Sequence, residues 1–225
     1  CRTPRIAFLF PGQGSQYVGM GRRWYQRYAV VAKHWSECDQ ALTGHLPKSL
    51  SDYVWREGYW AHPERSNEWN TALKDTQVAQ PAIVAASMAT VELLHDLGIE
   101  SDLSRGDSLG EYTALWASGA IDKATTLGLV SSRGAAMAAS GDAPGAMLSV
   151  SADPEVVETL LADATGYAVV SNYNAPNQTV VSGERDAIHA LAARCRSRSI
   201  ECTELEVSNA FHSRMNSARF SESAK

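Results

Sequence analysis

Cysteine is scarce in this sequence, which excludes a disulfide framework. The 225 residues contain four cysteines, Cys1, Cys38, Cys195 and Cys202, and no two of them form a Cys-x-x-Cys pair. Small domains that depend on disulfides are much denser in cysteine, and zinc-binding segments have paired spacings. We therefore expect these cysteines to be buried or incidental thiols.

A basic excess and long apolar runs are also absent. Lys and Arg number 20 against 25 Asp and Glu, which gives a net charge of −5 and argues against a nonspecific nucleic-acid surface. No apolar run approaches a membrane span, and the N-terminal residues lead into a strand-like segment rather than a signal-peptide core. We expect a cytoplasmic protein with no nucleic-acid or membrane partner, in which local groups bind any anionic ligand.

The composition that is present is globular, with 44% hydrophobic and 20% charged residues, and the length allows a sizeable core. Hydrophobic periodicity predicts two successive regions. The first region has strands at 5–10 and 99–103 and helices at 21–42, 76–97, 111–118 and 124–139. The second follows the order β-α-β-β-α-β of a ferredoxin-like unit, with strands at 146–151, 167–172, 178–182 and 200–207 and helices at 153–164 and 184–198.

The clearest motif is Gly106-Asp107-Ser108-Leu109-Gly110, a Gly-x-Ser-x-Gly pattern. In a nucleophile elbow, a sharp strand-to-helix turn exposes the serine hydroxyl, and the glycines let strand and helix pass closely. The same five residues are also compatible with a simple structural turn. Ser108 is the candidate nucleophile.

Three other positions are candidates for the same chemistry. The Gly12–Gln16 loop after the first strand can expose backbone N–H groups, although a purely structural loop remains an alternative. Arg133 lies among small or apolar neighbours, where it either binds an anion or forms an ordinary ion pair. His212 follows Ser108 in the chain and has the near-neutral pKa that a general base needs, although a lone histidine is more often a surface or core residue.

Taken together, these residues resemble the malonyl-CoA:acyl-carrier-protein acyltransferase family, which includes the acyltransferase domains of polyketide and fatty acid synthases. The resemblance covers nearly the whole chain in the family's order. It is carried by residues 10–16, 77–81, 106–111, 132–134, 172–176, 180–183 and 210–213. Within the family, residues 78–87 and 209–212 look most like those of iterative enediyne-type synthases, with the polyunsaturated-fatty-acid type close behind.

The resemblance implies a ping-pong transfer with an acyl-serine intermediate. Ser108 would attack an acyl-CoA thioester with His212 as the base, and the phosphopantetheine thiol of an acyl carrier protein would then take the acyl group. The backbone N–H groups of Gln13 and Leu109 correspond to the family's oxyanion hole. No bound cofactor or metal is implied, and neighbouring synthase domains would be partners together with the carrier.

The resemblance also implies a substrate and a fold. Arg133 matches the arginine that grips the free carboxylate of the acyl group, and Gln80 matches a glutamine that lines the same pocket. Phe211 falls where malonyl-selecting enzymes have phenylalanine, a ring that leaves little room for an α-methyl branch. The implied fold is α/β. An α/β-hydrolase-like large subdomain with a parallel sheet (1–141 and 207–225) carries an inserted ferredoxin-like subdomain (142–206).

The sequence departs from the family pattern in three places. Asp107 stands before the serine where the family has histidine, and a carboxylate there would repel the malonyl carboxylate. Asn209 replaces a histidine that is frequent in malonyl-type domains, and keeps hydrogen-bonding ability. The chain ends at Lys225, whereas the family continues with further helices, which is consistent with an excised or truncated domain.

Two alternatives use the same residues differently. A serine-dependent thioester hydrolase or editing enzyme would use Ser108 and His212 but pass the acyl group to water. It would have no need of the carboxylate-binding Arg133 and Gln80. A docking module with impaired catalysis would agree with Asp107 and the short C-terminus.

Overall fold

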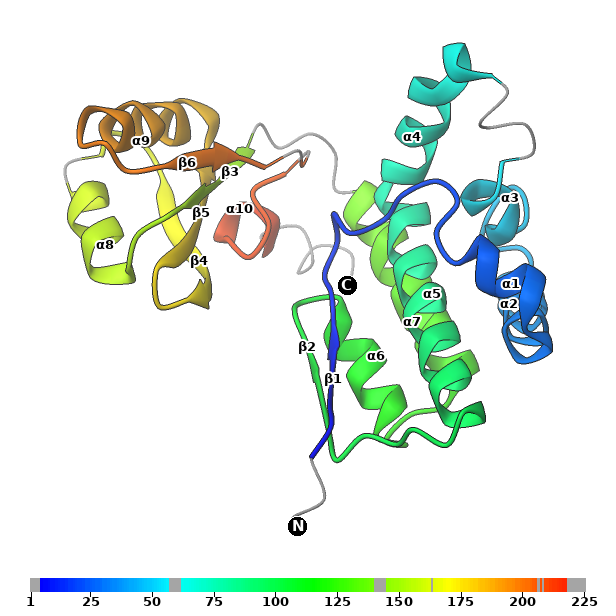
Figure 1. Ribbon diagram of the computed structural model, residues 1–225. Helices are drawn as coiled ribbons and strands as arrows, with labels where there is room; N and C mark the ends of the chain where they lie inside the picture. The colour runs from blue at the N-terminus through cyan, green and yellow to red at the C-terminus, as the bar shows by residue number, and fades with distance from the viewer. Residues whose placement is uncertain are drawn as a thin grey trace, which may run out of the picture. The chain divides into compact units, whose positions relative to one another are not determined.

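The computed structural model describes residues 5–56, 62–139, 145–162, 164–205, 207 and 209–217. By its internal contacts the chain divides into two compact units, Cys1–Ala139 (unit 1) and Ser140–Lys225 (unit 2), which are described separately (Figure 1). The contacts group the C-terminal segment with unit 2, whereas the sequence-based division joins 207–225 to the large subdomain. That division, with boundaries near 142 and 206, stays a prediction.

Unit 1 contains a parallel pair of strands and a set of helices (Figure 1). Strands β1 (Ala7–Phe10) and β2 (Leu103–Gly106) pair in parallel from Ala7 opposite Leu103 to Phe10 opposite Gly106. The mixed α/β architecture with a parallel sheet is therefore confirmed. The helical elements of unit 1 are α1 (Arg22–Arg27), α2 (Ala29–Ala41), α3 (Leu50–Val54), the 3₁₀ turn η1 (Pro63–Arg65), α4 (Ser66–Lys74), α5 (Thr76–Asp96), α6 (Gly110–Ala117) and α7 (Lys123–Ala139).

Helix α5 is the centre of unit 1 and packs against α2 and α7. It is capped by Asp75, whose Oδ1 accepts a hydrogen bond from Gln77 N at 2.9 Å. The helix starts at Thr76, so Pro81 lies in its second turn and removes the bond to the Gln77 carbonyl. In the described part of the chain, α5 is the one helix long and apolar enough to cross a membrane, and 67% of its apolar window is buried in the protein, as in a core helix.

Two expected elements differ in position. The strand predicted at 99–103 is β2 at 103–106, because Asp102 exchanges hydrogen bonds with Ile6 (Ile6 N to Oδ2 at 2.7 Å, Asp102 N to Ile6 O at 2.8 Å) and fixes where pairing begins. The single helix predicted at 21–42 is two helices, since Tyr28 has extended backbone angles. Trp24, in the first of these two helices, is 43% exposed.

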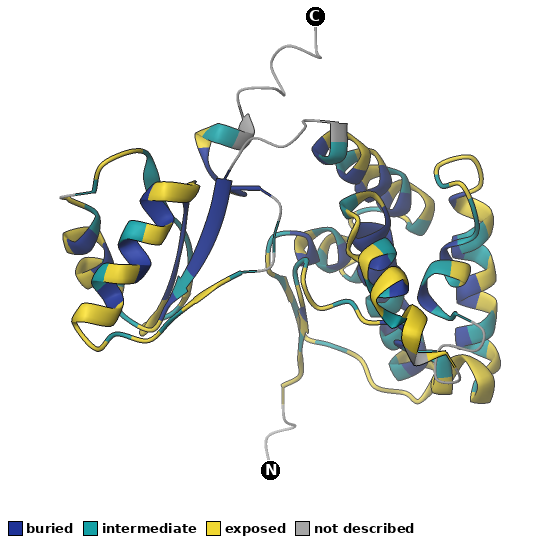
Figure 2. Cartoon of the chain, turned by 90° about the horizontal axis from the view of Figure 1, so that it is seen from above, coloured by how far each residue is buried: buried dark blue, intermediate teal, exposed yellow. Residues whose placement is uncertain are grey.

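Unit 2 is a four-stranded antiparallel sheet with two helices, followed by a short helix. Its sheet order is β4-β5-β3-β6, and the apolar faces of both longer helices join one core with the sheet. Figure 2 shows β3 and β5 as the buried central strands. The elements are β3 (Gly145–Val150), α8 (Pro154–Ala162), β4 (Ala168–Ala175), β5 (Gln178–Glu184), α9 (Arg185–Ser197), β6 (Cys202–Glu204) and α10 (Arg214–Ser217). The expected β-α-β-β-α-β order is present, with a shorter last strand.

The described cysteines fit the expectation of structural thiols. Cys38 and Cys195 are fully buried, and Cys202 is half-buried. Burial raises the pKa of the Cys38 thiol to about 12 and that of Cys195 to about 11, so neither forms a thiolate near neutral pH. Cys1 lies outside the described residues.

Candidate active site

The turn at Ser108 joins β2 to α6 by a backbone fit that only glycine permits. A Cβ on Gly106 would stand 2.0 Å from the Gly110 carbonyl carbon, and one on Gly110 would stand 2.2 Å from Phe10 O. Ser108 itself has φ 49°, in the region where a side chain is strained. Asp107 N donates to Phe10 O at 3.0 Å, and Gly110 N donates to Asp107 O at 2.8 Å. Strand and turn are thus locked together.

The Gly12–Gln16 loop lies beside this turn. A Cβ on Gly12 would meet Asp107 Oδ2 at 3.0 Å and Asp107 O at 3.1 Å, so the loop backbone runs against the residue before Ser108. Gly14 has φ 110°, and its N–H donates to Gln16 Oε1 at 2.9 Å. Gln13 is therefore the residue immediately after Gly12, which contacts Asp107. Leu109, the residue after the serine, is fully buried.

Arg133 and Gln80 form a direct pair between α7 and α5. Arg133 Nη1 donates to Gln80 Oε1 at 2.6 Å, and Gln80 is fully buried. The helices approach closely here because Gly134 has no side chain, and a Cβ on it would stand 2.8 Å from Thr76 O. Burial lowers the pKa of the Arg133 guanidinium, opposed by Tyr112 and Glu111. A half-buried guanidinium beside an amide can bind a carboxylate in bidentate fashion.

Thr76 belongs to the same group of side chains and was missed by the sequence analysis. Its hydroxyl accepts from Gln80 Nε2 at 2.9 Å and donates to Gln13 Oε1 at 3.1 Å. A usable signal was present, since Asp75 caps the helix and Thr76 precedes Gln80 by four residues, on the same helix face. The structure thus connects Gln13, Gln80 and Arg133, three residues predicted separately.

The remaining predicted residues lie in unit 2, in the segment after β6. Asn209 and Phe211 are buried, at 8% and 9% exposed, while His212 is exposed and has φ 56°. Ala210 packs on β3, where a Cβ on Gly145 would stand 2.7 Å from Ala210 Cβ. Ser108 and His212 therefore belong to different units, and each is described within its own.

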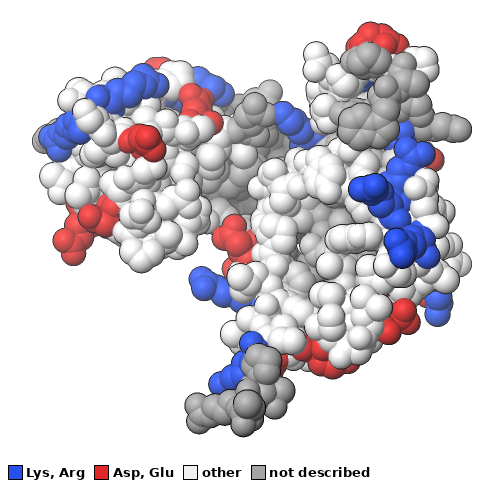
Figure 3. Space-filling view, viewed as in Figure 1, with Lys and Arg blue, Asp and Glu red and all other residues white. Residues whose placement is uncertain are grey.

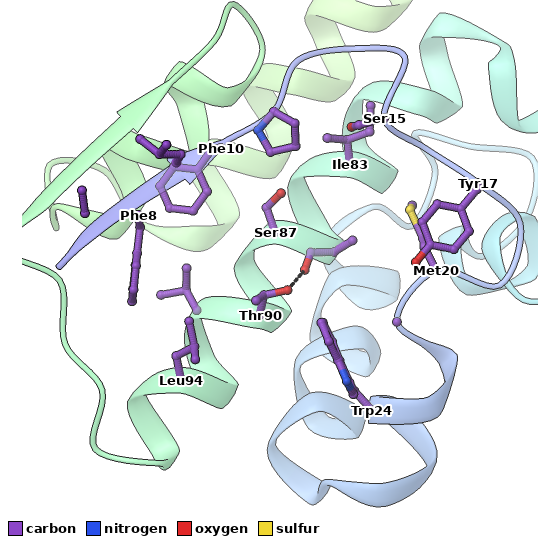
Figure 4. A pocket seen from close by; sticks show the side chains of 16 residues that line it. Phe8, Phe10, Ser15, Tyr17, Met20, Trp24, Ile83, Ser87, Thr90 and Leu94 are labelled. Carbon is purple, nitrogen blue, oxygen red and sulfur yellow. Dashed lines mark hydrogen bonds between the residues drawn. The ribbon is translucent and has the colours of Figure 1, made fainter.

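A separate cavity of about 410 Å³ lies in unit 1 between β1, the loop after it, α1 and α5 (Figure 4). Its lining is mainly apolar, with Phe8 and Phe10 from β1 and Ile83 and Leu94 from α5. Thr90 in its wall donates its hydroxyl to Ala86 O at 2.9 Å. None of the predicted site residues lines this cavity, so we assign it no part in the reaction.

Charged side chains are unevenly distributed on the face seen in Figure 3. On the face seen in Figure 3, Lys and Arg gather over α1 and α9, with acidic side chains between other elements. Among the residues that the structure describes, no group of three or more His, Cys, Asp or Glu side chains could hold a metal ion. Arg133 is the cation that the site geometry places beside a buried amide.

Comparisons with known proteins give one consistent result. Residues 7–220 match the family model of the acyl transferase domain. The mycoketide-CoA synthase of Mycobacterium tuberculosis is 36% identical over 209 residues, 93% of this chain and 5% of that protein. The malonyl CoA-acyl carrier protein transacylase of Synechocystis is 34% identical over 210 residues, 93% of this chain and 64% of that protein.

A solved structure agrees with these relatives. The complex of a type II polyketide synthase acyl-carrier protein with its malonyl-transacylase matches with a TM-score of 0.80 and 29% identity, over 94% of this chain and 66% of that one. The chain thus spans under two thirds of the length of the relatives named above. On this evidence, the chain belongs to the acyl transferase domain family.

Proposed function

We propose that this chain moves a malonyl group from CoA to the phosphopantetheine thiol of an acyl carrier protein, through an ester on Ser108. The observation that carries the proposal is the strained turn at Ser108, held by Gly106 and Gly110 with the Gly12 loop beside it. This backbone supports a nucleophile elbow at the end of β2. Family membership and the transacylase relative support the same reaction.

In the first half-reaction, Ser108 Oγ attacks the thioester carbonyl carbon of malonyl-CoA, and His212 takes the hydroxyl proton. The carbonyl electrons move to oxygen and form a tetrahedral oxyanion, which the backbone N–H groups of Gln13 and Leu109 stabilise. Collapse of this intermediate breaks the carbon–sulfur bond, and the CoA thiolate takes the proton from His212. The products are malonyl-Ser108 and CoA.

In the second half-reaction, the phosphopantetheine thiol of the carrier gives its proton to His212 and attacks the ester carbonyl. The same oxyanion position holds the second tetrahedral intermediate. Its collapse breaks the bond to Ser108 Oγ, which recovers its proton from His212. The solved complex of a carrier protein with its malonyl-transacylase supports this partner.

The carboxylate of malonyl is the feature that Arg133 would recognise. Its guanidinium is half-buried, so a carboxylate that binds it gains more than it would at a fully exposed arginine. Gln80 Oε1 accepts a hydrogen bond from Arg133 Nη1 at 2.6 Å, and this bond fixes the orientation of the guanidinium. Phe211 supplies a ring that disfavours an α-methyl branch, and we infer a preference for malonyl over methylmalonyl.

Asp107 and Asn209 are the substrate-side residues that depart from the family pattern. Asp107 is exposed, and its carboxylate is turned toward the Gly12 loop. A carboxylate next to the nucleophile opposes a negatively charged acyl group, and we infer that it weakens malonyl binding relative to a histidine there. Asn209 keeps an amide for hydrogen bonding but has no titrating group.

Unit 2 carries the proposed base. Its strand order β4-β5-β3-β6 and its β-α-β-β-α-β element order support a ferredoxin-like subdomain. The 209–213 segment, packed on β3 through Ala210, carries His212. We infer a large subdomain of 1–141 and 207–225 with 142–206 inserted.

The cellular setting is also a proposal. Relatives include multidomain synthases, of which this chain spans a small part, and this supports a domain of a polyketide synthase that acts in the cytoplasm on a carrier in the same assembly. The enediyne-type assignment rests on the sequence resemblance. The proposed reaction uses the thiols of CoA and phosphopantetheine and the side chains of this protein, with no bound cofactor.

The decisive experiment is intact-mass analysis of the protein after exposure to malonyl-CoA, methylmalonyl-CoA and acetyl-CoA. We expect a malonyl adduct on Ser108 that is lost in Ser108→Ala, and a weaker methylmalonyl adduct. Ser104→Ala is the matched control, since Ser104 lies in β2 outside the turn. Absence of every adduct from the wild-type protein would contradict catalysis and favour the docking module.

The fate of the acyl group distinguishes the hydrolase alternative from the proposed transferase. Labelled malonyl-CoA is incubated with and without a phosphopantetheinylated carrier protein. A transferase passes the label to the carrier and releases little free malonate. Release of malonate at the same rate in both incubations would support the hydrolase instead.

A further inference from the structure

A chain of hydrogen bonds in unit 1 runs in one direction from a cation to the loop beside Ser108. Arg133 Nη1 donates to Gln80 Oε1 at 2.6 Å, Gln80 Nε2 donates to Thr76 Oγ1 at 2.9 Å, and Thr76 Oγ1 donates to Gln13 Oε1 at 3.1 Å. Every donor points the same way, so each bond polarises the next. The two ends of this chain are the residues proposed for carboxylate binding and for the oxyanion hole.

The backbone around Thr76 is fixed independently of its hydroxyl. Asp75 Oδ1 caps the first turn of α5 at Gln77 N, and Gly134 brings α7 close to the Thr76 carbonyl. Position 76 is therefore held from two sides. A change of the side chain alone should alter the hydrogen bonds and leave the helix in place.

A threonine hydroxyl is well suited to this position because it accepts and donates at one short, stiff side chain. Gln80 is fully buried, so its amide cannot turn to water when Thr76 Oγ1 is removed. Among the described residues, its Nε2 would keep Met137 Sδ, at 3.1 Å, which is a weak acceptor. The amide can then reorient, which withdraws Oε1 from Arg133.

We propose that Thr76 is a positioning residue that couples the carboxylate-binding pair Arg133 and Gln80 to the loop residue Gln13. The inference rests on the proposed acyl transfer and adds a residue to it. Thr76 acts through its two amide partners and touches neither the thioester nor the carboxylate. An acyl group with a free carboxylate would therefore be bound and activated by one connected set of side chains.

The test compares Thr76→Val with Thr76→Ser in single-turnover acylation of Ser108. Valine keeps the shape and removes both hydrogen bonds, while serine keeps both. We expect Thr76→Val to raise the malonyl-CoA concentration at half-maximal rate about tenfold and to lower the maximal rate by a similar factor, as loss of two buried hydrogen bonds implies. Thr76→Ser should stay within about twofold of wild type, since its bonds remain.

Acetyl-CoA separates the two ends of the chain, because it has no carboxylate for Arg133. With this substrate, Thr76→Val should lower the maximal rate but leave the half-saturating concentration unchanged. In an Arg133→Gln background, the effect of Thr76→Val on malonyl-CoA affinity should disappear, while its effect on rate remains. This split is not expected of a merely structural residue.

Three results have different meanings. A wild-type protein that forms no adduct on Ser108 contradicts the proposed function. A wild-type protein that acylates while Thr76→Val matches it, or while Thr76→Ser is as impaired as valine, overturns the role of Thr76. If valine disturbs thermal unfolding, Thr76→Ala removes the hydroxyl without adding bulk, and the same comparisons decide.

Discussion

The two sheets of this protein are held in place by different means. In unit 1 the β1-β2 pair is little buried, with Leu9 73% and Leu103 60% exposed, and it meets the start of α6 backbone to backbone at Gly106 and Gly110. In unit 2 the central strands are buried by side chains against α8 and α9 (Figure 2). The position of Ser108 therefore depends on a close backbone fit, which tolerates no added atom, whereas the sheet of unit 2 rests on an ordinary apolar core.

The largest expected effect comes from breaking that backbone fit. Gly110→Ala would put a methyl group 2.2 Å from Phe10 O, so β1 and α6 must separate. We expect a loss of at least about 4 kcal/mol in the free energy of unfolding, together with loss of Ser108 acylation. Thermal and denaturant unfolding, followed by circular dichroism, measure the change.

Gly128→Ala is the matched control, since Gly128 lies within α7 and nothing stands within 4 Å of its added Cβ. It should leave stability unchanged or raise it by about 0.5–1 kcal/mol, as alanine does in a helix. Equal effects of the two substitutions would contradict the difference drawn between the sheets.

A change in unit 2 should separate activity from stability. His212→Gln removes the proposed base from an exposed position, so we expect Ser108 acylation to slow about 100- to 10,000-fold while the unfolding temperature stays close to that of wild type. The rate is measured by stopping the acylation reaction at successive times and quantifying the adduct by mass spectrometry. His189→Gln on α9 is the control, as His189 is also exposed and pairs with Glu204 at 3.3 Å. A normal rate in His212→Gln would remove this residue from the mechanism.

A smaller effect is expected at the residue before the nucleophile. Asp107→His should lower the half-saturating malonyl-CoA concentration about fivefold, because a carboxylate near the substrate's own carboxylate is removed. Acetyl-CoA should show no such gain. Asp107→Asn separates the lost charge from the added imidazole. Weaker malonyl-CoA affinity in both variants would contradict the inferred repulsion.

The sequence was most informative where one residue type dictates the backbone. Gly106 and Gly110 indicate the turn, because a Cβ at either position would clash with the neighbouring backbone. The hydrophobic period locates most helices within a few residues. The start of β2 could not be read in this way, because it depends on Asp102 pairing with Ile6, which is 96 residues away. The helix predicted at 21–42 differs for a similar reason, since hydrophobic spacing does not reveal that Tyr28 interrupts it.

The candidate site was predictable residue by residue but not in its connections. The residues themselves point to Arg133 and to the Gly12–Gln16 loop, and the family resemblance assigns roles to Gln13 and Gln80. Neither singles out Thr76, which links them. A threonine in a first helical turn is ordinary, and only the fold shows that α7 and the loop after β1 meet there. That Ser108 and His212 act together stays a prediction.

The last expected effect concerns stability alone, and it is an acid sensitivity in the helices of unit 1. Burial alone would raise the pKa of Glu92, but the neighbouring His34 and Lys123 outweigh it and hold this pKa at about 2, against an ordinary 4.5. Lys123 Nζ lies 2.6 Å from Glu92 Oε1, and His34 Nδ1 lies 3.2 Å from the same atom. The unfolded state binds more protons between these values, so this stability is fully present above pH 4.5 and is lost as the pH falls toward 2.

Glu92→Gln tests this contribution and sharpens the contrast between the units. The variant should unfold more easily than wild type at pH 6, and the difference should shrink as the pH is lowered toward 2, because protonated Glu92 resembles glutamine. Hydrogen exchange followed by mass spectrometry should place the loss in α2, α5 and α7, with exchange in β3 and β5 unchanged. Asp96→Asn, an exposed carboxylate at the end of the same helix, is the control. A difference between Glu92→Gln and wild type that stays constant with pH would mean that packing, rather than the charge of Glu92, stabilises this part of unit 1.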